Sequence, residues 1–292
     1  MDFKATLNTF QKRVESGIGQ WVPSKDTAPS HLHAAMRYSL EAGGKRLRPI
    51  IVLAVAELFQ TIEDPLPAAV ALECIHTYSL IHDDLPTIDN SDLRRGKPTC
   101  HKQFDEPTAL LAGDALLTLA FEILAKAYQK DSALAKDLIL DLSSAAGSQR
   151  LIGGQMEDIL GEHSDYTKEQ LGYIHLNKTA ALITSAMTMG ARIGKAAEQE
   201  IAMLSEIGKC VGLSFQILDD ILDATSDNQI LGKPTGSDQE NEKTTYIKLY
   251  GIEGAREQAK SLTGKARNLC MEIQGNNHFL MELIASLEHR IL

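Results

Sequence analysis

Cysteine and positive charge are both scarce in this sequence, and each shortage excludes a class of protein. The 292 residues include four widely spaced cysteines and no Cys-x-x-Cys pair. This excludes a disulfide-stapled scaffold or a cysteine zinc site and is typical of a reducing compartment. Lysine and arginine number 29 against 39 aspartates and glutamates, which gives a formal net charge of −10. An acidic chain is a poor candidate for nucleic-acid binding, because a basic face supplies most of that affinity.

Long hydrophobic runs are also missing. The longest wholly apolar run, Ile50–Ala56, is far shorter than the roughly 20 residues that span a bilayer. The first residues, Met-Asp-Phe-Lys, lack the apolar core of a signal peptide and the arginines of a transit peptide. We therefore expect a cytoplasmic protein without membrane insertion.

Proline is almost absent from the second half of the chain, where only Pro234 follows Pro107. Alternating β-branched runs closed by tight turns are missing as well, so strands are not expected. Apolar residues recur instead at helical spacing, which predicts helices at roughly 3–18, 29–42, 49–59, 66–84, 107–129, 133–160, 167–192, 197–225, 242–272 and 278–290. Because no linker-like or low-complexity segment divides the chain, we expect a single all-α domain over residues 1–292.

The first of two aspartate clusters contains Asp83, Asp84 and Asp89. Asp83 and Asp89 would point about 240° apart on a continuous helix. Pro86 disfavours helical backbone at the residue before it, so the helix should end there. The chain can then turn and bring Asp89 back beside Asp83.

The second cluster lies in an uninterrupted helical pattern. Asp219 and Asp223 are four residues apart and share a helix face, with Gln216 one turn before them. Carboxylates on such an apolar helix are costly to bury without counter-charge. Either cluster alone could be a solvated acidic helix end. Together they predict a site where Mg²⁺ binds a diphosphate, because Mg²⁺ prefers oxygen ligands and phosphates.

With these two motifs the chain resembles the trans-prenyl diphosphate synthases, the all-α family that elongates isoprenoid chains. The similarity extends, in family order, to GGKRLRP (43–49), ECIHTYSLIHDDLP (73–86), LRRGKPT (93–99), LAGDALL (111–117), GGQMEDI (153–159), Lys178-Thr179 and LGKPTGSD (231–238). It implies a large orthogonal bundle of about ten or more helices around a central cavity, and a homodimer. It also implies an enzyme that joins dimethylallyl or geranyl diphosphate to isopentenyl diphosphate with about three Mg²⁺ ions.

The resemblance also assigns roles to individual residues. It places Mg²⁺ at Asp83, Asp84, Asp89, Asp219 and Asp223. It places isopentenyl diphosphate at Gly44, Lys45, Arg48, His76 and Arg95. It places the allylic diphosphate at Arg94, Lys178 and Lys233, with Lys243 a weaker candidate. Lys178, Thr179 and Gln216 should stabilise the allylic cation, while Gln155 and Asp158 border the site.

Product length is expected to depend on Tyr78 and Ser79, about one helical turn before Asp83. A large tyrosine there resembles the bacterial short-chain pattern that stops at C15, which predicts farnesyl diphosphate. A C20 (geranylgeranyl) product is the alternative, since Tyr78 could equally be a core aromatic. Many relatives end in a basic pair that closes over isopentenyl diphosphate. Here Arg290 either does this alone or closure is weaker.

Three alternatives from other classes stay open at this point. A terpene cyclase shares the aspartate chemistry but does not need the basic motifs at 43–49 and 93–98 for a second substrate. A non-catalytic prenyltransferase subunit would be expected to lose one aspartate cluster, and this chain keeps both. A four-carboxylate oxygen-activating bundle requires Glu-x-x-His on two helices, and Glu73–His76 is a single match.

Overall fold

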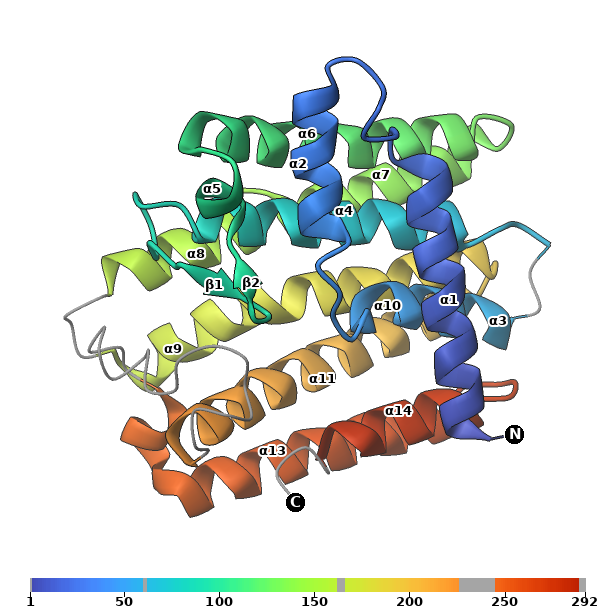
Figure 1. The fold of residues 1–292 in the computed structure, drawn as a ribbon. Helices are drawn as coiled ribbons and strands as arrows, with labels where there is room; N and C mark the ends of the chain where they lie inside the picture. Colours follow the sequence, from blue (N-terminus) through green and yellow to red (C-terminus); the bar gives the residue numbers. More distant parts are fainter. Residues whose placement is uncertain (1, 60–61, 162–165, 226–244, 289–292) are drawn as a thin grey trace. The chain divides into compact units, whose positions relative to one another are not determined.

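The computed structural model describes residues 2–59, 62–161, 166–225 and 245–288. The chain divides into two compact units, with boundaries inside helices α3 (Leu47–Leu58) and α7 (Ser132–Ala146) and between residues 63 and 64. We name them the N-terminal unit (2–53 and 64–139) and the C-terminal unit (54–63 and 140–292). Both are helical almost throughout (Figure 1), which confirms the all-α class. The single domain expected from the sequence stays a prediction.

The N-terminal unit is built around α4, a helix buried on most of its circumference. Helices α1, α2 and α6 all contact α4. Its elements are α1 (Phe3–Trp21), α2 (Ser30–Leu40), the first part of α3, α4 (Leu66–Asp83), β1 (Leu93–Arg94), β2 (Lys97–Pro98), α5 (Cys100–Gln103), α6 (Glu106–Ala127) and the first part of α7. The β1–β2 hairpin was not predicted, because strands of two residues are too short to give an alternating pattern.

The C-terminal unit is built around α11, which contacts α10 and α13. Its further elements are α8 (Leu151–Leu160), α9 (Lys168–Ile174), the π-helical η1 (His175–Ala180), α10 (Ala181–Ile193), α11 (Glu198–Thr225), α13 (Tyr246–Glu272) and α14 (His278–Glu288). The single helix predicted at 133–160 is wrong, because residues 147–150 separate α7 from α8. The predicted start at 242 lies outside the described residues.

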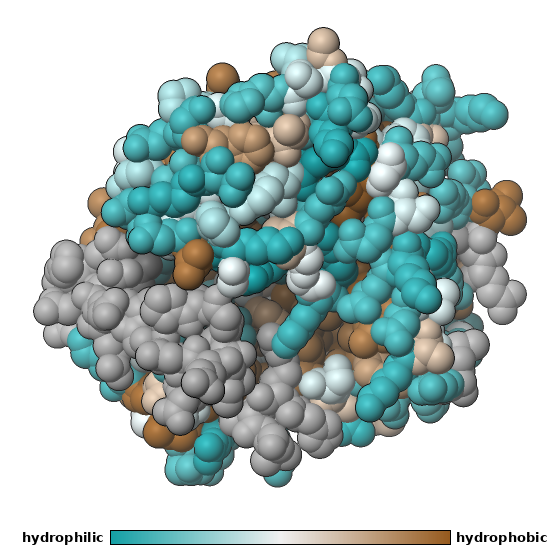
Figure 2. Space-filling view, in the orientation of Figure 1, coloured by the Kyte–Doolittle hydropathy of each residue, from teal (hydrophilic) through white to brown (hydrophobic). Residues whose placement is uncertain are grey.

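In the described part of the chain, helices α6 and α11 are long and apolar enough to cross a membrane by length and composition alone. Within its own unit, α6 packs along α4, and α11 packs along α10 and α13. Apolar helices that pack against several neighbours are typical of the core of a large helical protein. The face of the molecule drawn in Figure 2 is predominantly hydrophilic where it is coloured.

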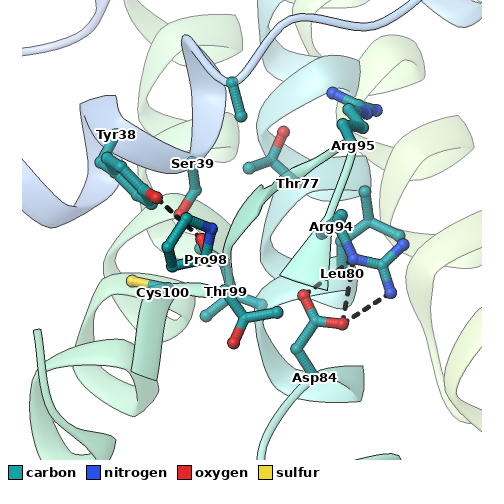
Figure 3. Close-up of a pocket in the computed structure, with 12 residues that line it drawn as sticks. Tyr38, Ser39, Thr77, Leu80, Asp84, Arg94, Arg95, Pro98, Thr99 and Cys100 are labelled. Atoms are coloured by element: carbon teal, nitrogen blue, oxygen red, sulfur yellow. Dashed lines mark hydrogen bonds and ion pairs between the residues drawn. The ribbon is translucent and has the colours of Figure 1, made fainter. Parts of the chain in front are cut away.

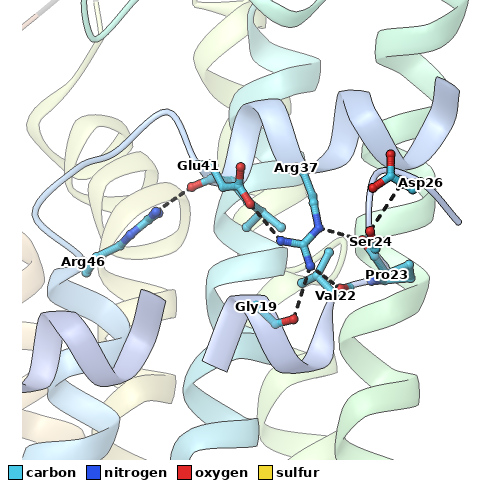
Figure 4. A network of polar contacts seen from close by, with 9 residues as sticks. Gly19, Val22, Pro23, Ser24, Asp26, Arg37, Glu41 and Arg46 are labelled. Atoms are coloured by element: carbon cyan, nitrogen blue, oxygen red, sulfur yellow. Dashed lines mark hydrogen bonds and ion pairs between the residues drawn. The ribbon is translucent and has the colours of Figure 1, made fainter. Parts of the chain in front are cut away.

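Arg37 fixes the connection between α1 and α2. Its guanidinium donates to the backbone carbonyls of Pro23 at 2.7 Å and Val22 at 2.6 Å, and it pairs with the exposed Glu41 at 2.8 Å (Figure 4). These carbonyls follow the last turn of α1 and would otherwise need water or another donor. Arg37 therefore ties the end of α1 to α2.

Arg46 belongs to the core, although it lies in the basic run that resembles a phosphate site. Its side chain is 1% exposed and makes 2.7 Å ion pairs with Glu15 of α1 and Glu73 of α4. Its guanidinium also donates to the Leu40 carbonyl at 2.5 Å. Because each of its three guanidinium nitrogens donates a hydrogen bond to a different element, Arg46 links α1, α2 and α4 of the N-terminal unit.

Glu73→Gln should destabilise the protein much more than Glu41→Gln does. Both variants remove a carboxylate from an arginine, but the Glu73 side chain is 3% exposed and that of Glu41 is 53% exposed. Breaking a buried pair costs about 3–5 kcal/mol, against about 0–1 kcal/mol for a surface pair. Urea unfolding of the two variants and the wild type measures the difference. Equal losses would contradict the structural role of Glu73.

Candidate active site

The first aspartate cluster (Asp83, Asp84 and Asp89) forms where α4 ends. The helix stops at Asp83, and the Asp89 N–H donates to the Asp83 carbonyl at 2.9 Å. Asn90, with φ of 45°, lets the chain turn back at this point. The predicted return of Asp89 to Asp83 is therefore confirmed, and it follows from the proline that interrupts the helix.

Asp84 holds Arg94 in a bidentate ion pair. Arg94 Nε donates to Oδ2 at 2.8 Å and Nη2 donates to Oδ1 at 2.7 Å (Figure 3). Burial raises the pKa of the Asp84 carboxyl, and Arg94 opposes that rise. Burial alone would lower the pKa of Arg94, but its bonds to Asp84 outweigh this and raise it, so Arg94 stays charged. Sequence reasoning treated Asp84 as a metal ligand and missed this pair.

Arg95 lies at the tip of the β1–β2 hairpin with φ of 54°. Its Nη1 donates to the Gly43 carbonyl. A Cβ atom on Gly44 would lie 2.6 Å from the Arg95 guanidinium, so a side chain there would push the arginine away. Arg94 and Arg95, adjacent in sequence, thus point to different partners (Figure 3), as predicted for neighbours in a loop.

His76 lies among arginines two helical turns before the aspartates. Its Nε2 is 3.4 Å from Arg48 Nη1. Burial, followed by the charges of Arg48, Arg95 and Arg94, lowers the pKa of His76 well below 6.5, so the ring is neutral at neutral pH. Guanidinium groups gathered around a neutral ring repel one another until an anion binds between them. With the exposed Lys45 nearby in sequence, this arrangement fits a diphosphate.

A small pocket in the N-terminal unit lies beside two of these arginines. Arg94 and Arg95 form part of its wall, and residues of α2, α4 and the hairpin complete it (Figure 3). Tyr38 Oη donates to the Pro98 carbonyl at 2.8 Å and so holds β2 against α2. The hairpin that carries both arginines is therefore anchored on both sides.

Tyr78 is a buried residue of α4, with 4% of its surface exposed. Its ring meets that of His82 edge-on at 5.7 Å. Burial raises its pKa to about 12, and its hydroxyl has no hydrogen-bond partner among the described residues. Ser79 donates to the His76 carbonyl at 3.0 Å. These contacts are compatible both with a floor under a growing chain and with a core aromatic.

In the C-terminal unit, Lys178 is held by Asp158. Lys178 Nζ lies 2.6 Å from Asp158 Oδ2. The pair can form because α8 packs closely on η1: a Cβ atom on Gly154 would lie 2.4 Å from the Lys178 amide nitrogen. Close packing on η1 thus explains Gly154 in the predicted helix. The ion pair itself joins two helices and was not predicted.

The second aspartate cluster (Asp219, Asp220 and Asp223) lies on α11, which is unbroken to Thr225 as predicted. Asp219 and Asp223 are half-buried on one face. Among the described residues, Asp223 Oδ1 is buried without a hydrogen-bond partner. A buried carboxylate oxygen of this kind fits a cation ligand.

A chain of hydrogen bonds connects two of the three residues expected beside the allylic cation, Thr179 and Gln216. Thr179 Oγ1 donates to Gln216 Oε1 at 2.8 Å, and Gln216 Nε2 donates to Asp220 Oδ1 at 3.1 Å. Asp220 is 5% exposed, and its Oδ2 accepts from the Tyr246 N–H at 3.0 Å. The structure therefore brings Thr179 and Gln216 together and adds Asp220, to which sequence reasoning gave no role.

Each aspartate cluster, taken within its own unit, suits a metal that arrives with its substrate. In the part of the chain that the structure describes, no three His, Cys, Asp or Glu side chains are grouped to hold a metal by themselves. Mg²⁺ is usually bound by one or two carboxylates together with water and substrate phosphates, so Asp83, Asp89, Asp219 and Asp223 fit that ion. Lys233, Lys243 and Arg290 lie outside the described residues.

His175 should make the protein less stable at acidic pH. It is 7% exposed and stacks on Tyr246 at 5.1 Å, and burial lowers its pKa to about 3. Below pH ~6.5 the unfolded chain binds a proton that the folded ring rejects, so stability falls as pH falls through this range. The loss by about pH 5 is about 2 kcal/mol from this ring.

Urea unfolding at about pH 7 and about pH 5 measures this contribution. His175→Gln should lose less stability between the two pH values than the wild type. His278→Gln, at an exposed position of α14, should behave as the wild type does. An unchanged pH dependence in His175→Gln would contradict the assignment.

Comparisons with known proteins show the family of this chain. The polyprenyl synthetase family model matches residues 29–273. Farnesyl diphosphate synthase of Micrococcus luteus is 46% identical, over 90% of each chain. The large subunit 1 of the heterodimeric geranylgeranyl pyrophosphate synthase of Arabidopsis thaliana chloroplasts is 45% identical over 91% of this chain and 73% of its own.

Solved structures show the same fold. An FPP/GFPP synthase of Zymomonas mobilis is 35% identical, with a TM-score of 0.88 over 98% of both chains. Geranyltransferase of Helicobacter pylori, complexed with magnesium and isoprenyl diphosphate, is 33% identical with a TM-score of 0.82, over 98% of this chain and 97% of its own. The chain therefore belongs to the polyprenyl synthetase family and is a trans-prenyltransferase, as its aspartate and basic motifs predicted.

Proposed function

We propose that this prenyltransferase condenses dimethylallyl and geranyl diphosphate with isopentenyl diphosphate and releases farnesyl diphosphate and inorganic diphosphate. The observation that carries the proposal is the separation of two adjacent arginines, with Arg94 on Asp84 and Arg95 on the Gly43 carbonyl. Two fixed guanidinium groups suit two diphosphates, whereas a terpene cyclase binds one. Geranylgeranyl diphosphate is the second candidate product, because the relatives include synthases of both kinds.

The proposed reaction requires Mg²⁺, and we assign Asp83, Asp89, Asp219 and Asp223 as its ligands. The magnesium in the related Helicobacter pylori geranyltransferase supports the choice of ion. When bound, about three Mg²⁺ ions would neutralise the charge that develops on the departing diphosphate. Asp84 has a different task here, since both of its oxygens accept from Arg94 and so orient that guanidinium toward an anion.

The chain's own residues act on both substrates. Arg94 and Lys178, with Lys233 as the sequence implies, bind the allylic diphosphate as its C–O bond breaks. Thr179 and Gln216 place oxygen atoms near the resulting cation. Gly44, Lys45, Arg48, His76 and Arg95 hold isopentenyl diphosphate, whose double bond attacks the cation. The departing diphosphate takes the proton that is then lost, and apolar walls exclude the water that would quench the cation.

The assembly and compartment are also proposals. We infer a homodimer, supported by the exposed leucines of α6, Leu110 and Leu111, which are 47% and 56% exposed. Large exposed apolar patches mark interaction sites, and these two leucines would form part of one in the proposed dimer. We place the protein in the cytoplasm, with no nucleic-acid partner and no membrane insertion, since its charge is −10 and all four cysteines are free.

Product analysis tests the function. The purified protein is incubated with isopentenyl diphosphate, Mg²⁺ and each allylic starter in turn, and products are separated by chromatography. We expect C15 product even with excess isopentenyl diphosphate. Mainly C20 product would support the second candidate. Cyclic hydrocarbons without consumption of isopentenyl diphosphate, or no product with any starter, would overturn the proposal.

Tyr78→Ala should lengthen the product to C20 or more. If Tyr78 is the floor of the chain cavity, its removal opens room for at least one further five-carbon unit. Truncating a buried aromatic costs about 3–5 kcal/mol when the space stays empty, and a growing chain would recover part of that. Tyr128→Ala is the matched control, since Tyr128 is 3% exposed in the same unit. It should be destabilised without a change in product length.

Products of these variants distinguish the two interpretations of Tyr78. An unchanged C15 product in Tyr78→Ala, or the same lengthening in Tyr128→Ala, would show that Tyr78 is only a core residue.

The two arginines should affect different substrates. Arg95→Ala should raise KM for isopentenyl diphosphate more than for the allylic substrate, and Arg94→Ala should do the reverse. Losing a desolvated charged hydrogen bond costs about 2–5 kcal/mol. Steady-state kinetics with each substrate varied in turn gives both values. Equal effects of both variants on both substrates would show that the assignment is wrong.

A further inference from the structure

We propose that Asp220 is a positioning residue that sets the direction of the hydrogen bonds running through Gln216 to Thr179. This inference rests on the proposed function of Thr179 and Gln216 and extends it to a residue outside the proposed metal ligands. Thr179, Gln216, Asp220 and Tyr246 all belong to the C-terminal unit. Their contacts therefore involve one compact unit.

We call the hydrogen bonds that join Thr179, Gln216, Asp220 and the Tyr246 N–H the relay. The chemistry of the Asp220 carboxylate determines which group is the donor in each of them. An ionised carboxylate only accepts hydrogen bonds. Asp220 Oδ2 accepts from the Tyr246 N–H at 3.0 Å, and Oδ1 lies 3.1 Å from the Gln216 amide. Gln216 must therefore present its N–H to Asp220 and keep its oxygen for Thr179. The Thr179 hydroxyl must then donate to that oxygen, over 2.8 Å.

This direction matters for a reaction that passes through a cation. With its hydrogen directed to Gln216, the Thr179 hydroxyl leaves only oxygen lone pairs for other partners. A lone pair stabilises a neighbouring positive charge, whereas an O–H hydrogen would repel it. Hydrogen bonds in a chain also polarise one another, so the buried negative charge of Asp220 makes the Thr179 oxygen more negative. Asp220 thus acts on the cation through two other side chains.

Asp220→Asn should reverse the relay at almost unchanged shape. The Tyr246 N–H still needs an oxygen, so the new amide turns its N–H₂ toward Gln216. Gln216 then flips to offer its oxygen, and its N–H₂ faces Thr179, whose hydrogen is released toward the site. We expect kcat to fall roughly 10- to 100-fold, the usual range for a residue that orients a neighbouring site group, with KM changing little. Gln216→Leu should lose a similar factor while leaving the Tyr246 bond intact.

Three measurements separate this role from the alternatives. The Mg²⁺ concentration for half-maximal activity should be unchanged in Asp220→Asn and raised in Asp219→Asn. In a protein that already carries Thr179→Val, Asp220→Asn should not lower kcat any further. Gln216→Glu added to Asp220→Asn should raise kcat about tenfold or more above that of Asp220→Asn alone. The new carboxylate accepts hydrogen bonds from both neighbours, so the Thr179 hydroxyl again donates toward residue 216.

Controls for folding and for function accompany these variants. Thermal unfolding followed by circular dichroism should give Asp220→Asn a cooperative transition. Asp141→Asn, which removes a carboxylate paired with Arg192 at 2.8 Å in the same unit, should keep the wild-type kcat.

Several outcomes would overturn the inference: a raised Mg²⁺ requirement in Asp220→Asn, multiplicative losses in the Thr179→Val background, no rescue by Gln216→Glu, or a wild-type kcat in Asp220→Asn. None of these depends on whether the product is C15 or C20. A C20 product would correct the proposed function and leave the relay intact.

Discussion

The cost of holding like charges together governs the structure of the site. In the N-terminal unit, Arg48, Arg94 and Arg95 all act to lower the pKa of His76, and the aspartates at the end of α4 lie close in the chain. Such groups are tolerated because individual members are tied to fixed partners, as Arg94 is to Asp84 and Arg95 to the Gly43 carbonyl. The remaining charge is neutralised only when anion and cation bind together, which explains why a diphosphate with Mg²⁺ suits these residues.

Irregular backbone delivers these charges to their positions. Pro86 ends α4 and lets Asp89 return to Asp83, whereas a regular helix would carry it away. Gly154 removes the side chain that would keep α8 from the Lys178 backbone. Lys178 and Thr179 themselves lie on η1, a π-helical turn, and such turns are frequent at functional sites. Each irregularity costs local stability and is stabilised by packing within its unit.

Local spacing in the sequence predicted those features that depend on a single element. The face shared by Asp219 and Asp223 follows from helical periodicity, and the return of Asp89 follows from one proline. The break at residues 147–150 and the π-helical winding of η1 were missed, because apolar residues recur almost as in a continuous helix. The Asp84–Arg94 and Lys178–Asp158 pairs join different elements, and no local pattern encodes such contacts. Burial does not by itself assign a role to Tyr78, because a chain floor and a core residue share one burial pattern.

The two Asp-Asp pairs show how neighbouring, chemically identical residues receive different tasks. Successive residues on a helix point about 100° apart, so one aspartate of a pair can meet solvent while the next enters the core. The second member is the buried one in both pairs: Asp84 is 3% exposed and Asp220 is 5% exposed, while Asp83 and Asp219 are half-buried. A buried carboxylate must be satisfied by protein donors, and these two bind Arg94 and Gln216. In the proposed site, the half-buried first member of each pair binds the incoming cation, and the buried second member orients a neighbouring side chain.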